Sequence, residues 1–398
     1  MRRGVWILVL LVLFLLLSGR GDAATFSRYT QNYFGTASML FLYETEGAQE
    51  TWEAVKELLE AIDGAVSISR EDSDLARFNT LAAGEGMPVS DLTADILSVA
   101  FRAWEMTGGL YDPTVFPLVD LWGFSPRFNR NTYRQEMPYD RPLMDGHPAP
   151  ASGEDVAALL PLVGLGKISL VREENGWMLY KHTPPVEIGG MLMQAQIDLG
   201  GLAKGYACDC VIRLLQERGY TEGYFVCGGS SMAFLKRPEG RAFTVSAGKP
   251  RGGEGKTYAQ VQAMNTTLSS SADYSHSYTA EDVLYCHIMD PRTGYPMNMP
   301  GPGIPQAGVA TVTLLGESAA LNDALSTALC LMGPEDALEF LRGRNEQMVM
   351  AAYRTGEDRL EVVSNMPAEQ VEILDEQYVW ACGEDAEGHS IYTGTLVP

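Results

Sequence analysis

Two polar side chains interrupt an apolar segment in the last quarter of the 398-residue chain. In LNDALSTALCLMG, Asp323 and Thr327 stand four residues apart, so on a helix they project from one face, one turn apart. A carboxylate among Ala, Leu and Met is costly to bury unless it is paired or bound to a metal, and oxygen ligands suit a hard cation such as Mg²⁺. The segment therefore predicts either a magnesium site or an exposed polar stripe.

A second candidate is the glycine pair in IDLGGLAKGYA, residues 197–207. Gly200 and Gly201 allow the backbone to approach a ligand closely, and a helix that starts behind them presents unpaired N–H groups. Lys204 adds a cation at the same place. The stretch predicts a phosphate site, or else a glycine pair that serves tight packing.

A third candidate is the histidine in CHIMDPRTGYP, residues 286–296. The prolines and the glycine predict a tight turn after a strand over 284–289, with Asp290 bonding to turn amides. The near-neutral pKa of His287 suits proton transfer from an attacking hydroxyl, and a structural histidine is the alternative. The other histidines fall in polar connections or near the C-terminus, and we place none of them in the site: His147, His182, His276 and His389.

Two further stretches carry weaker signals. TGGLYDPTVFPLVDLWGF, residues 107–124, combines a glycine turn, Asp112 and aromatic side chains. It predicts the wall of a pocket for a planar ring, or a packed loop. LSSSADY, residues 268–274, supplies hydroxyls and Asp273 on a predicted turn.

These candidates must be positioned by alternating helices and strands. Helical spacing of apolar residues predicts helices over 49–63, from Ser90 or Asp91 to Gly108, over 200–219, over 318–332 and from Pro334 onward. Apolar alternation and buried runs predict a hairpin over 167–186 and strands over 223–235 and 308–316. The segment 127–152, rich in Pro, Asn, Arg and Asp, predicts a long surface loop. The irregular interleaving indicates an α+β fold with mixed, largely antiparallel sheets and packed helices.

Composition limits the partners. The chain is 46% hydrophobic and 20% charged, which is typical of a globular protein with a large core. Its formal net charge of −22 repels nucleic acid and anionic lipid, so we expect no nucleic-acid partner. A phosphate ligand would have to be held by local devices, such as helix-start amides, a few placed cations or a metal.

The N-terminus has the pattern of a secretory signal. Two arginines precede an apolar run of 13 residues, Val5–Leu17, which is shorter than the roughly 20 that a spanning helix needs. We predict a signal peptide or short anchor over 1–23 and an exported, extracytoplasmic protein, attached to a membrane only through this segment if it is uncleaved. Residues 17–20 look like a bacterial lipobox, but Arg20 stands where the lipidated cysteine should be.

The six cysteines give no zinc-binding spacing. Most of them stand in apolar runs, and a chain of this size can build a sufficient core without disulfides. The sequence therefore predicts buried free thiols.

In combination and in this order, the motifs are far more specific than any one of them. The chain resembles the FAD:protein FMN transferase (ApbE-like) family, which splits FAD at its pyrophosphate and joins FMN through a phosphoester to a threonine or serine of a target protein. The matching stretches are FGTASM (34–39), SDLARFN (73–79), GGLYDPTVFPLVDLWGF (108–124), DLGGLAKGYA (198–207), VCGGSSMA (226–233), LSSSADY (268–274), HIMDPRTGYP (287–296) and DALSTALCLMG (323–333).

The resemblance implies a T-fold-like ApbE architecture, with a flavin transferase region over 24–398 built as one unit or as two intimately packed subdomains. It implies that His287 is the base for the acceptor hydroxyl and that Asp323 acts in catalysis. Mg²⁺ would be bound by the Ala203 carbonyl and the side chains of Asp323 and Thr327. FAD, as substrate, would be bound by Thr36, Asp112, Gly200, Gly201, Lys204, Gly228, Gly229, Ser271, Asp273 and His287.

The sequence departs from the family pattern in three places. Phe34 stands where the family usually has methionine, Ala272 stands where glycine is common, and the segment 127–152 is longer than expected. The acceptor pattern Ser/Thr-Gly-Ala-Ser/Thr does not occur in the chain, so the expected partner is the flavin-accepting domain of an exported or membrane redox protein. Two alternatives use the same site: an FAD pyrophosphatase giving FMN and AMP, and a non-catalytic flavin carrier.

Overall fold

The structure is a computed structural model. It describes residues 26–125, 143–144, 147–250, 256–280, 283–298, 308–353, 359–374, 376, 378–384 and 390–396. The predicted signal segment 1–23 lies outside the described residues, as does most of the predicted loop 127–152.

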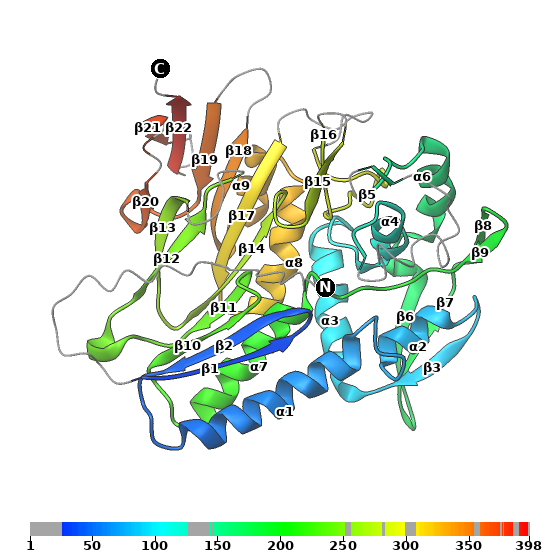
Figure 1. The fold of residues 1–398 in the computed structure, drawn as a ribbon, viewed down its shortest axis with the longest axis horizontal. Coiled ribbons are helices and arrows are strands. Elements are labelled where there is room, and N and C mark those ends of the chain that lie inside the picture. Colours follow the sequence, from blue (N-terminus) through cyan, green and yellow to red (C-terminus); the bar gives the residue numbers. More distant parts are fainter. Residues whose placement is uncertain are drawn as a thin grey trace, which may run out of the picture.

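The described residues form a central ten-stranded sheet. Its strands pair antiparallel throughout, and Figure 1 shows them running side by side through one half of the molecule. In spatial order they are β1 Ser27–Tyr33, β2 Thr36–Leu42, β10 Gly223–Cys227, β11 Ser231–Phe234, β14 Thr266–Ala272, β17 Gly308–Gly316, β18 Gln347–Tyr353, β19 Arg359–Ser364, β22 Ser390–Leu396 and β21 Tyr378–Glu384.

The central strands are buried on both faces. In β10, Phe225 and Cys227 belong to the apolar core on the helix side, whereas Tyr224 and Val226 belong to the core on the opposite side. Successive side chains of a strand point to opposite faces, so a strand covered on both sides is a continuous apolar run instead of an alternating one. This is why GYFVC contains no polar residue.

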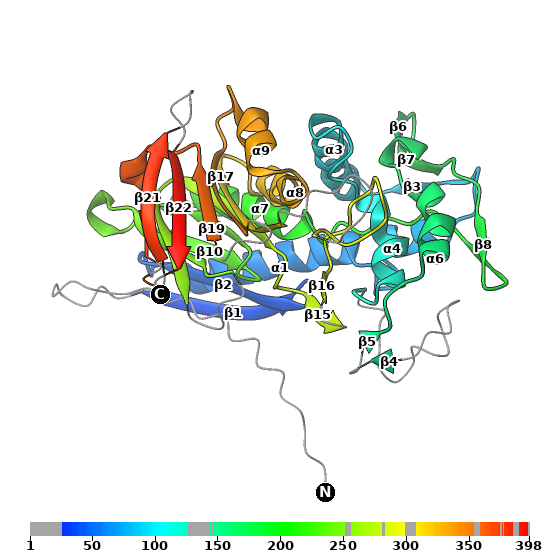
Figure 2. The same cartoon turned by 90° about the horizontal axis from the view of Figure 1, so that it is seen from above.

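Helices cover one face of the sheet. Figure 2 shows α1, α7 and α8 together along that side, and α7 and α8 pack on the strands that carry the candidate motifs. The helices are α1 Ala48–Val66, α2 Asp74–Thr80, α3 Asp91–Met106, α4 Phe116–Leu121, α6 Gly153–Leu159, α7 Ala203–Glu217, α8 Ala319–Cys330 and α9 Pro334–Leu341. Short 3-10 turns occur at Pro113–Val115, Leu160–Leu162, Leu165–Lys167, Pro238–Gly240 and Ala368–Gln370.

A three-stranded sheet covers the other face of the central sheet. Phe243 and Tyr258 of this small sheet pack into the same core as Tyr224 of β10. The small sheet orders β12 Phe243–Gly248, β13 Thr257–Ala263 and β20 Val371–Ile373. The remaining strands pair in smaller groups: β3 Gly86–Val89 with β7 Gly176–Lys181 and β6 Ile168–Glu173, β4 Leu143–Met144 with β5 His147–Pro148, β8 Val186–Ile188 with β9 Met191–Met193, and β15 Ser277–Ala280 with β16 Val283–Cys286.

Helices α7 and α8 approach each other unusually closely at Gly205. A Cβ placed on Gly205 would collide with the Ala319 carbonyl and would lie 2.8 Å from the Cα of Ala320. One turn further along α7, the Asp209 carboxylate accepts hydrogen bonds from the backbone N–H groups of Ala319 and Ala320, at 2.6 and 3.0 Å. Asp209 thereby caps the first turn of α8, where unpaired N–H groups favour a negative charge.

Most expectations from the sequence are confirmed. The fold is α+β with antiparallel sheets, the hairpin over 167–186 is β6–β7, and the strands over 223–235 and 308–316 are present. Where the structure describes cysteine side chains, five are free: Cys208, Cys227, Cys286 and Cys330 are buried and Cys210 is half-buried.

Three boundaries differ from the prediction. Helix α7 begins at Ala203 instead of Gly200, because Gly200 and Gly201 form the turn that leads into it. The segment that contains Ser271 is strand β14 up to Ala272, not a turn, because it pairs with both β11 and β17. Strand β16 ends at Cys286, so the following histidine lies just beyond it.

The described helices include none that is both long enough and apolar enough to cross a bilayer.

The contact at Gly205 can be tested with a Gly205→Ala variant. Because the added methyl group meets the backbone of α8, which cannot move aside as a flexible side chain would, we expect the free energy of unfolding to fall by about 2 kcal/mol. Urea denaturation followed by circular dichroism measures this change.

Gly64→Ala is the matched control. Gly64 lies inside α1, and a Cβ there would make only an ordinary contact, 3.7 Å from the Arg70 guanidinium carbon. That substitution should stabilise the protein by about 0.5–1 kcal/mol, since alanine loses less backbone freedom in a helix. Equal effects of the two substitutions would show that α7 and α8 are not in rigid contact.

Candidate active site

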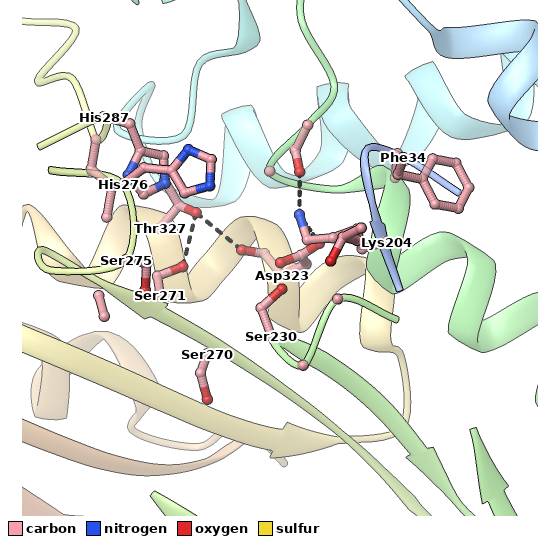
Figure 3. A pocket seen from close by; sticks show the side chains of 18 of the residues that line it. Phe34, Lys204, Ser230, Ser270, Ser271, Ser275, His276, His287, Asp323 and Thr327 are labelled. Carbon is pink, nitrogen blue, oxygen red and sulfur yellow. Dashed lines mark hydrogen bonds and ion pairs between the residues drawn. The ribbon is translucent and has the colours of Figure 1, made fainter. Parts of the chain in front are cut away.

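The candidate motifs meet around one cavity with a volume of about 1190 Å³. Its walls come from the start of α7, from α8, from the β10–β11 connection, from β14 and from the segment after β16, and Figure 3 shows their side chains converging. The predicted site residues that line it are Thr36, Asp112, Gly200, Gly201, Ala203, Lys204, Gly228, Gly229, Ser271, His287, Asp323 and Thr327.

Asp323 is a nearly enclosed carboxylate on α8, with 3% of its surface exposed. Its Oδ2 accepts a hydrogen bond of 3.2 Å from the Gly205 backbone N–H and lies 3.9 Å from the Lys204 ammonium nitrogen. Burial raises the pKa of Asp323, and the Lys204 charge acts in the opposite direction. The exposed-stripe alternative for α8 is therefore wrong for Asp323.

Thr327 lies one turn after Asp323 on the same helix. Its hydroxyl lies 3.2 Å from the Asp323 backbone carbonyl, to which it donates, and 3.2 Å from the Ser271 hydroxyl of β14. A Cβ on Gly201 would lie 3.6 Å from the Thr327 hydroxyl, so the turn before α7 comes close to this part of α8. The glycine at 201 therefore leaves space beside the Thr327 hydroxyl.

Two glycines between β10 and β11 form the next wall. Gly228 and Gly229 have φ angles of +64° and +69°, a backbone conformation that other residues rarely adopt. A Cβ on Gly228 would lie 2.7 Å from Cγ2 of Thr36 and 3.2 Å from Cδ of Lys204. The pair therefore allows β2, the β10–β11 connection and α7 to meet at the cavity. The Lys204 ammonium donates to the Gly200 carbonyl at 2.6 Å.

His287 extends the ladder of the β15–β16 hairpin. Ser277 pairs with Cys286, and the next pair brings His276 opposite His287, whose backbone N–H donates to the His276 carbonyl at 3.0 Å. The ring centroids of the two histidines are 5.2 Å apart. Both rings line the cavity, as Figure 3 shows. The expectation that His287 is the only histidine in a site context is therefore wrong.

The turn after His287 is held rigidly. The Asp290 carboxylate accepts a hydrogen bond from the Arg292 backbone N–H at 2.9 Å and also binds the Arg292 guanidinium. The Gly294 carbonyl accepts a hydrogen bond of 3.0 Å from the Trp122 indole at the end of α4. The turn thus fixes the direction in which the chain leaves the cavity, as its sequence predicts.

The protein environment keeps the imidazole of His287 neutral. Burial, followed by the neighbouring His276 and Lys204, lowers the pKa of His287 to about 3. Burial and then Lys204 also lower the pKa of His276. The His287 ring keeps some surface toward the cavity, whereas its Nδ1 atom is enclosed and has no hydrogen-bond partner among the described residues. A neutral ring is able to accept a proton, but a pKa near 3 makes it a weak base unless a bound anion raises that pKa.

Asp112 reaches the cavity wall, but its oxygens are used inside the protein. One oxygen accepts hydrogen bonds from the backbone and hydroxyl of Thr114, and the other accepts from the Trp104 indole and the Leu165 N–H. Burial raises the pKa of Asp112, and these donors oppose that rise. The carboxylate therefore shapes the wall of the cavity by holding three segments together.

Asp273 is the one predicted site residue that the structure places away from the cavity. It is 1% exposed, and its Oδ2 accepts a hydrogen bond of 3.1 Å from the Asn298 amide. Because β14 continues through Ala272, the next residue turns toward β17, where the Asp273 N–H donates to the Ala310 carbonyl at 3.0 Å. Ser271 faces the cavity instead.

The donor set fits a hard cation. A buried carboxylate, a hydroxyl at one turn's distance and a carbonyl at the start of α7 are oxygen ligands, the type that Mg²⁺ prefers. Within the described residues, no three His, Cys, Asp or Glu side chains converge on a metal-sized site. A cation here would therefore depend on Asp323 as its protein charge and complete its coordination with neutral oxygens and ligand.

The sequence analysis missed several polar residues of the cavity wall besides His276, and two of them stand close to the candidate motifs. Tyr111 and Ser230 line the cavity, and their hydroxyls have no hydrogen-bond partner among the described residues. Both stand inside motifs singled out in the sequence, in GGLYDPTV and VCGGSSMA. The pattern identified these segments but not which of their side chains face the cavity.

Comparison with known sequences defines the class. Residues 34–352 match the sequence model of the ApbE family, which covers most of the chain. The chain belongs to the ApbE family. The FAD:protein FMN transferase of Escherichia coli K12 is 28% identical over 299 residues, covering 75% of this chain and 76% of that protein. The FAD:protein FMN transferase of Haemophilus influenzae is 29% identical over 303 residues, covering 76% and 78%.

Solved structures show the same fold. The flavin transferase ApbE from Vibrio cholerae superposes with a TM-score of 0.68 at 25% identity, covering 86% of this chain and 97% of that one. The ApbE protein from Thermotoga maritima superposes with a TM-score of 0.66 at 22% identity, covering 83% and 97%. The predicted ApbE-like architecture is confirmed.

The low pKa of His287 predicts how stability depends on pH. The unfolded chain binds a proton on this histidine near pH 6.5, whereas the folded protein does so only near pH 3. Between these values the unfolded state binds more protons, so stability falls as the pH is lowered, by about 1 kcal/mol per pH unit. In urea denaturation between pH 7 and pH 5, a His287→Asn variant should lose less stability than the wild type.

His182→Asn serves as the control, because His182 is exposed and lies outside the cavity. That variant should follow the wild-type pH dependence. If the wild type and His287→Asn lose stability in parallel as the pH falls, His287 is not held neutral by the fold.

Proposed function

We propose that this protein cleaves FAD at its pyrophosphate and transfers the FMN moiety to a threonine or serine hydroxyl of a separate protein, releasing AMP. Membership of the ApbE family and the names of the relatives support this activity. The observation that supports this activity for the present protein is that one cavity is lined by Lys204, Asp323, Thr327 and His287. The cavity volume of about 1190 Å³ is sufficient for a dinucleotide.

The chemistry is a displacement at phosphorus. The acceptor oxygen attacks the phosphorus of the FMN half, the bond from that phosphorus to the AMP oxygen breaks, and the hydroxyl proton leaves with the base. His287 is the proposed base, because its neutral imidazole lines the cavity. An anionic pyrophosphate bound in the cavity raises the pKa of a nearby imidazole, which brings it closer to the range of an effective base.

Mg²⁺ is the proposed cofactor. The Asp323 carboxylate, the Thr327 hydroxyl and the Ala203 carbonyl would hold it. When bound, it would supply positive charge against the oxygens of the pyrophosphate, which is the main requirement for cleaving a phosphoanhydride. Lys204 and the N–H groups at the start of α7 would supply the remaining positive potential from the protein itself.

The cellular setting follows from the sequence. We propose that residues 1–23 direct export and that the flavin transferase region over 24–398 works outside the cytoplasm on a domain of an exported or membrane redox protein. The basis is the signal-like N-terminus and the absence of the acceptor pattern from this chain. Any membrane attachment would run through the N-terminal segment if it is uncleaved.

The activity is tested by intact mass spectrometry. The protein, FAD and Mg²⁺ are incubated with a redox-protein domain that contains Ser/Thr-Gly-Ala-Ser/Thr, and AMP is measured in parallel. We expect the acceptor to gain the mass of an FMN phosphoester, with one AMP for each transfer and no gain in EDTA. The matched control is the same domain with the acceptor hydroxyl residue replaced by alanine.

Other outcomes assign the protein differently. AMP and FMN without a mass gain on several such domains would indicate an FAD pyrophosphatase. FAD binding without AMP would indicate a flavin carrier, and either result would contradict the transferase.

The role of Asp323 is tested separately with Asp323→Asn, which keeps the shape and removes the charge. Since a catalytic cation contributes several kcal/mol, we expect the Mg²⁺-dependent transfer rate to fall by at least about 100-fold. Asp91→Asn, an exposed carboxylate at the start of α3, should transfer at the wild-type rate. Full Mg²⁺-dependent turnover by Asp323→Asn would disprove the assignment of Asp323 as the metal ligand.

A further inference from the structure

The Tyr111 hydroxyl is a buried donor that the described residues leave without a partner. The side chain is 4% exposed and packs in the core between sheet and helices, and its backbone N–H donates to the Thr107 hydroxyl at 3.1 Å. Burying an unsatisfied hydroxyl costs about 1–3 kcal/mol. A phenylalanine would fill the same space without that cost, so the hydroxyl contributes nothing to the stability of the free protein.

The hydroxyl belongs to the end of the cavity where the α7 turn meets α8. Tyr111 lines the cavity, and its Cε2 would lie 3.8 Å from a Cβ on Gly201, the same glycine that borders the Thr327 hydroxyl. Burial, followed by the charges of Asp323, Asp198 and Asp112, raises the pKa of Tyr111 well above its usual value. The phenol therefore keeps its proton and is available as a hydrogen-bond donor.

The neighbouring carboxylates already have other donors. Asp198 accepts a hydrogen bond from the Gly200 N–H at 2.9 Å, and Asp323 accepts one from the Gly205 N–H at 3.2 Å. Both oxygens of Asp112 are engaged within the protein. None of the three makes a hydrogen bond with the Tyr111 hydroxyl. Among the described residues no acceptor is left for this hydroxyl, so a molecule that enters the cavity is the candidate to supply one.

We propose that the Tyr111 hydroxyl donates a hydrogen bond to a pyrophosphate oxygen of bound FAD and so positions the phosphate that is attacked. This inference rests on the proposed function, because it names the contact of a residue within that site. A phosphate oxygen fits better than a sugar or ring acceptor, since the Tyr111 ring borders Gly201, in the turn that leads to Lys204 and the start of α7.

The test compares Tyr111→Phe with the wild type in the full chain by calorimetric titration. FAD and ADP carry the pyrophosphate, riboflavin carries none, and each is titrated in EDTA and in Mg²⁺. A hydrogen bond to a charged oxygen corresponds to roughly tenfold or more in affinity. We expect Tyr111→Phe to bind FAD and ADP at least about tenfold more weakly in both buffers, and to bind riboflavin as the wild type does.

Tyr258→Phe is the matched control. Tyr258 is fully buried, its hydroxyl also lacks a partner among the described residues, and it does not line the cavity. Without ligand, both variants should unfold at the wild-type temperature or above, since each loses an unsatisfied buried hydroxyl. With saturating FAD, only Tyr111→Phe should show a smaller rise in melting temperature.

Several results would overturn the inference. The first is an unchanged affinity of Tyr111→Phe for FAD and ADP, and the second is an equal loss of affinity for riboflavin. The third is a loss of affinity seen only with Mg²⁺, which would indicate a contact to metal-bound water. The fourth is a lower melting temperature without ligand, which would indicate a structural role. Failure of the proposed function is a separate result. A wild type that neither binds FAD nor flavinylates an acceptor overturns both, whereas an active wild type with an unchanged Tyr111→Phe overturns this inference alone.

Discussion

The close contact between α7 and α8 is the constraint on which the site depends. Gly205 has no side chain, so α8 can approach the backbone of α7 and the Gly205 N–H can donate to Asp323. Asp209 binds the first amides of α8 and fixes its position along α7. The turn before α7 is thereby brought beside Thr327. One helix pair supplies the Lys204 ammonium, the Asp323 carboxylate and the Thr327 hydroxyl. If α7 and α8 were further apart, the motifs would contain the same residues, but their side chains would no longer meet at the site.

Electrostatics explain why those few groups must be so close together. With a net charge of −22, the protein as a whole repels a pyrophosphate. Burial disfavours the charge of Asp323, and the Lys204 ammonium at 3.9 Å offsets this only partly, so the ionised carboxylate is costly without a further positive charge. The proposed Mg²⁺ and a phosphate entering together would relieve both problems, because the cation would neutralise the carboxylate and the phosphate at once. Each alone would leave a charge uncompensated.

The sequence predicts a site residue when its position depends on neighbours along the chain, and fails when the position depends on how distant segments pair. The spacing of Asp323 and Thr327 on one helix face is a local pattern and required no tertiary knowledge. Gly228 and Gly229 were assigned to the site only through the family resemblance. His276 was missed because only the register of the β15–β16 hairpin places it opposite His287, and a register cannot be derived from a polar turn. Asp273 was misplaced for a related reason. Strand β14 continues as far as Ala272, so the Asp273 side chain points into the interior, where it accepts a hydrogen bond from Asn298.

Which polar atoms the fold leaves without a hydrogen-bond partner depends on tertiary packing, and at this site stability and function oppose each other. Buried hydroxyls are normally hydrogen-bonded, because an unpaired one lowers stability. Tyr111, Tyr224, Ser230 and His287 each present an unpartnered buried atom and line one cavity. If the fold satisfied these atoms internally, as it does for Asp112, the free protein would be more stable but would have fewer groups to offer a ligand. Their clustering is therefore better explained by the bound state than by the free one.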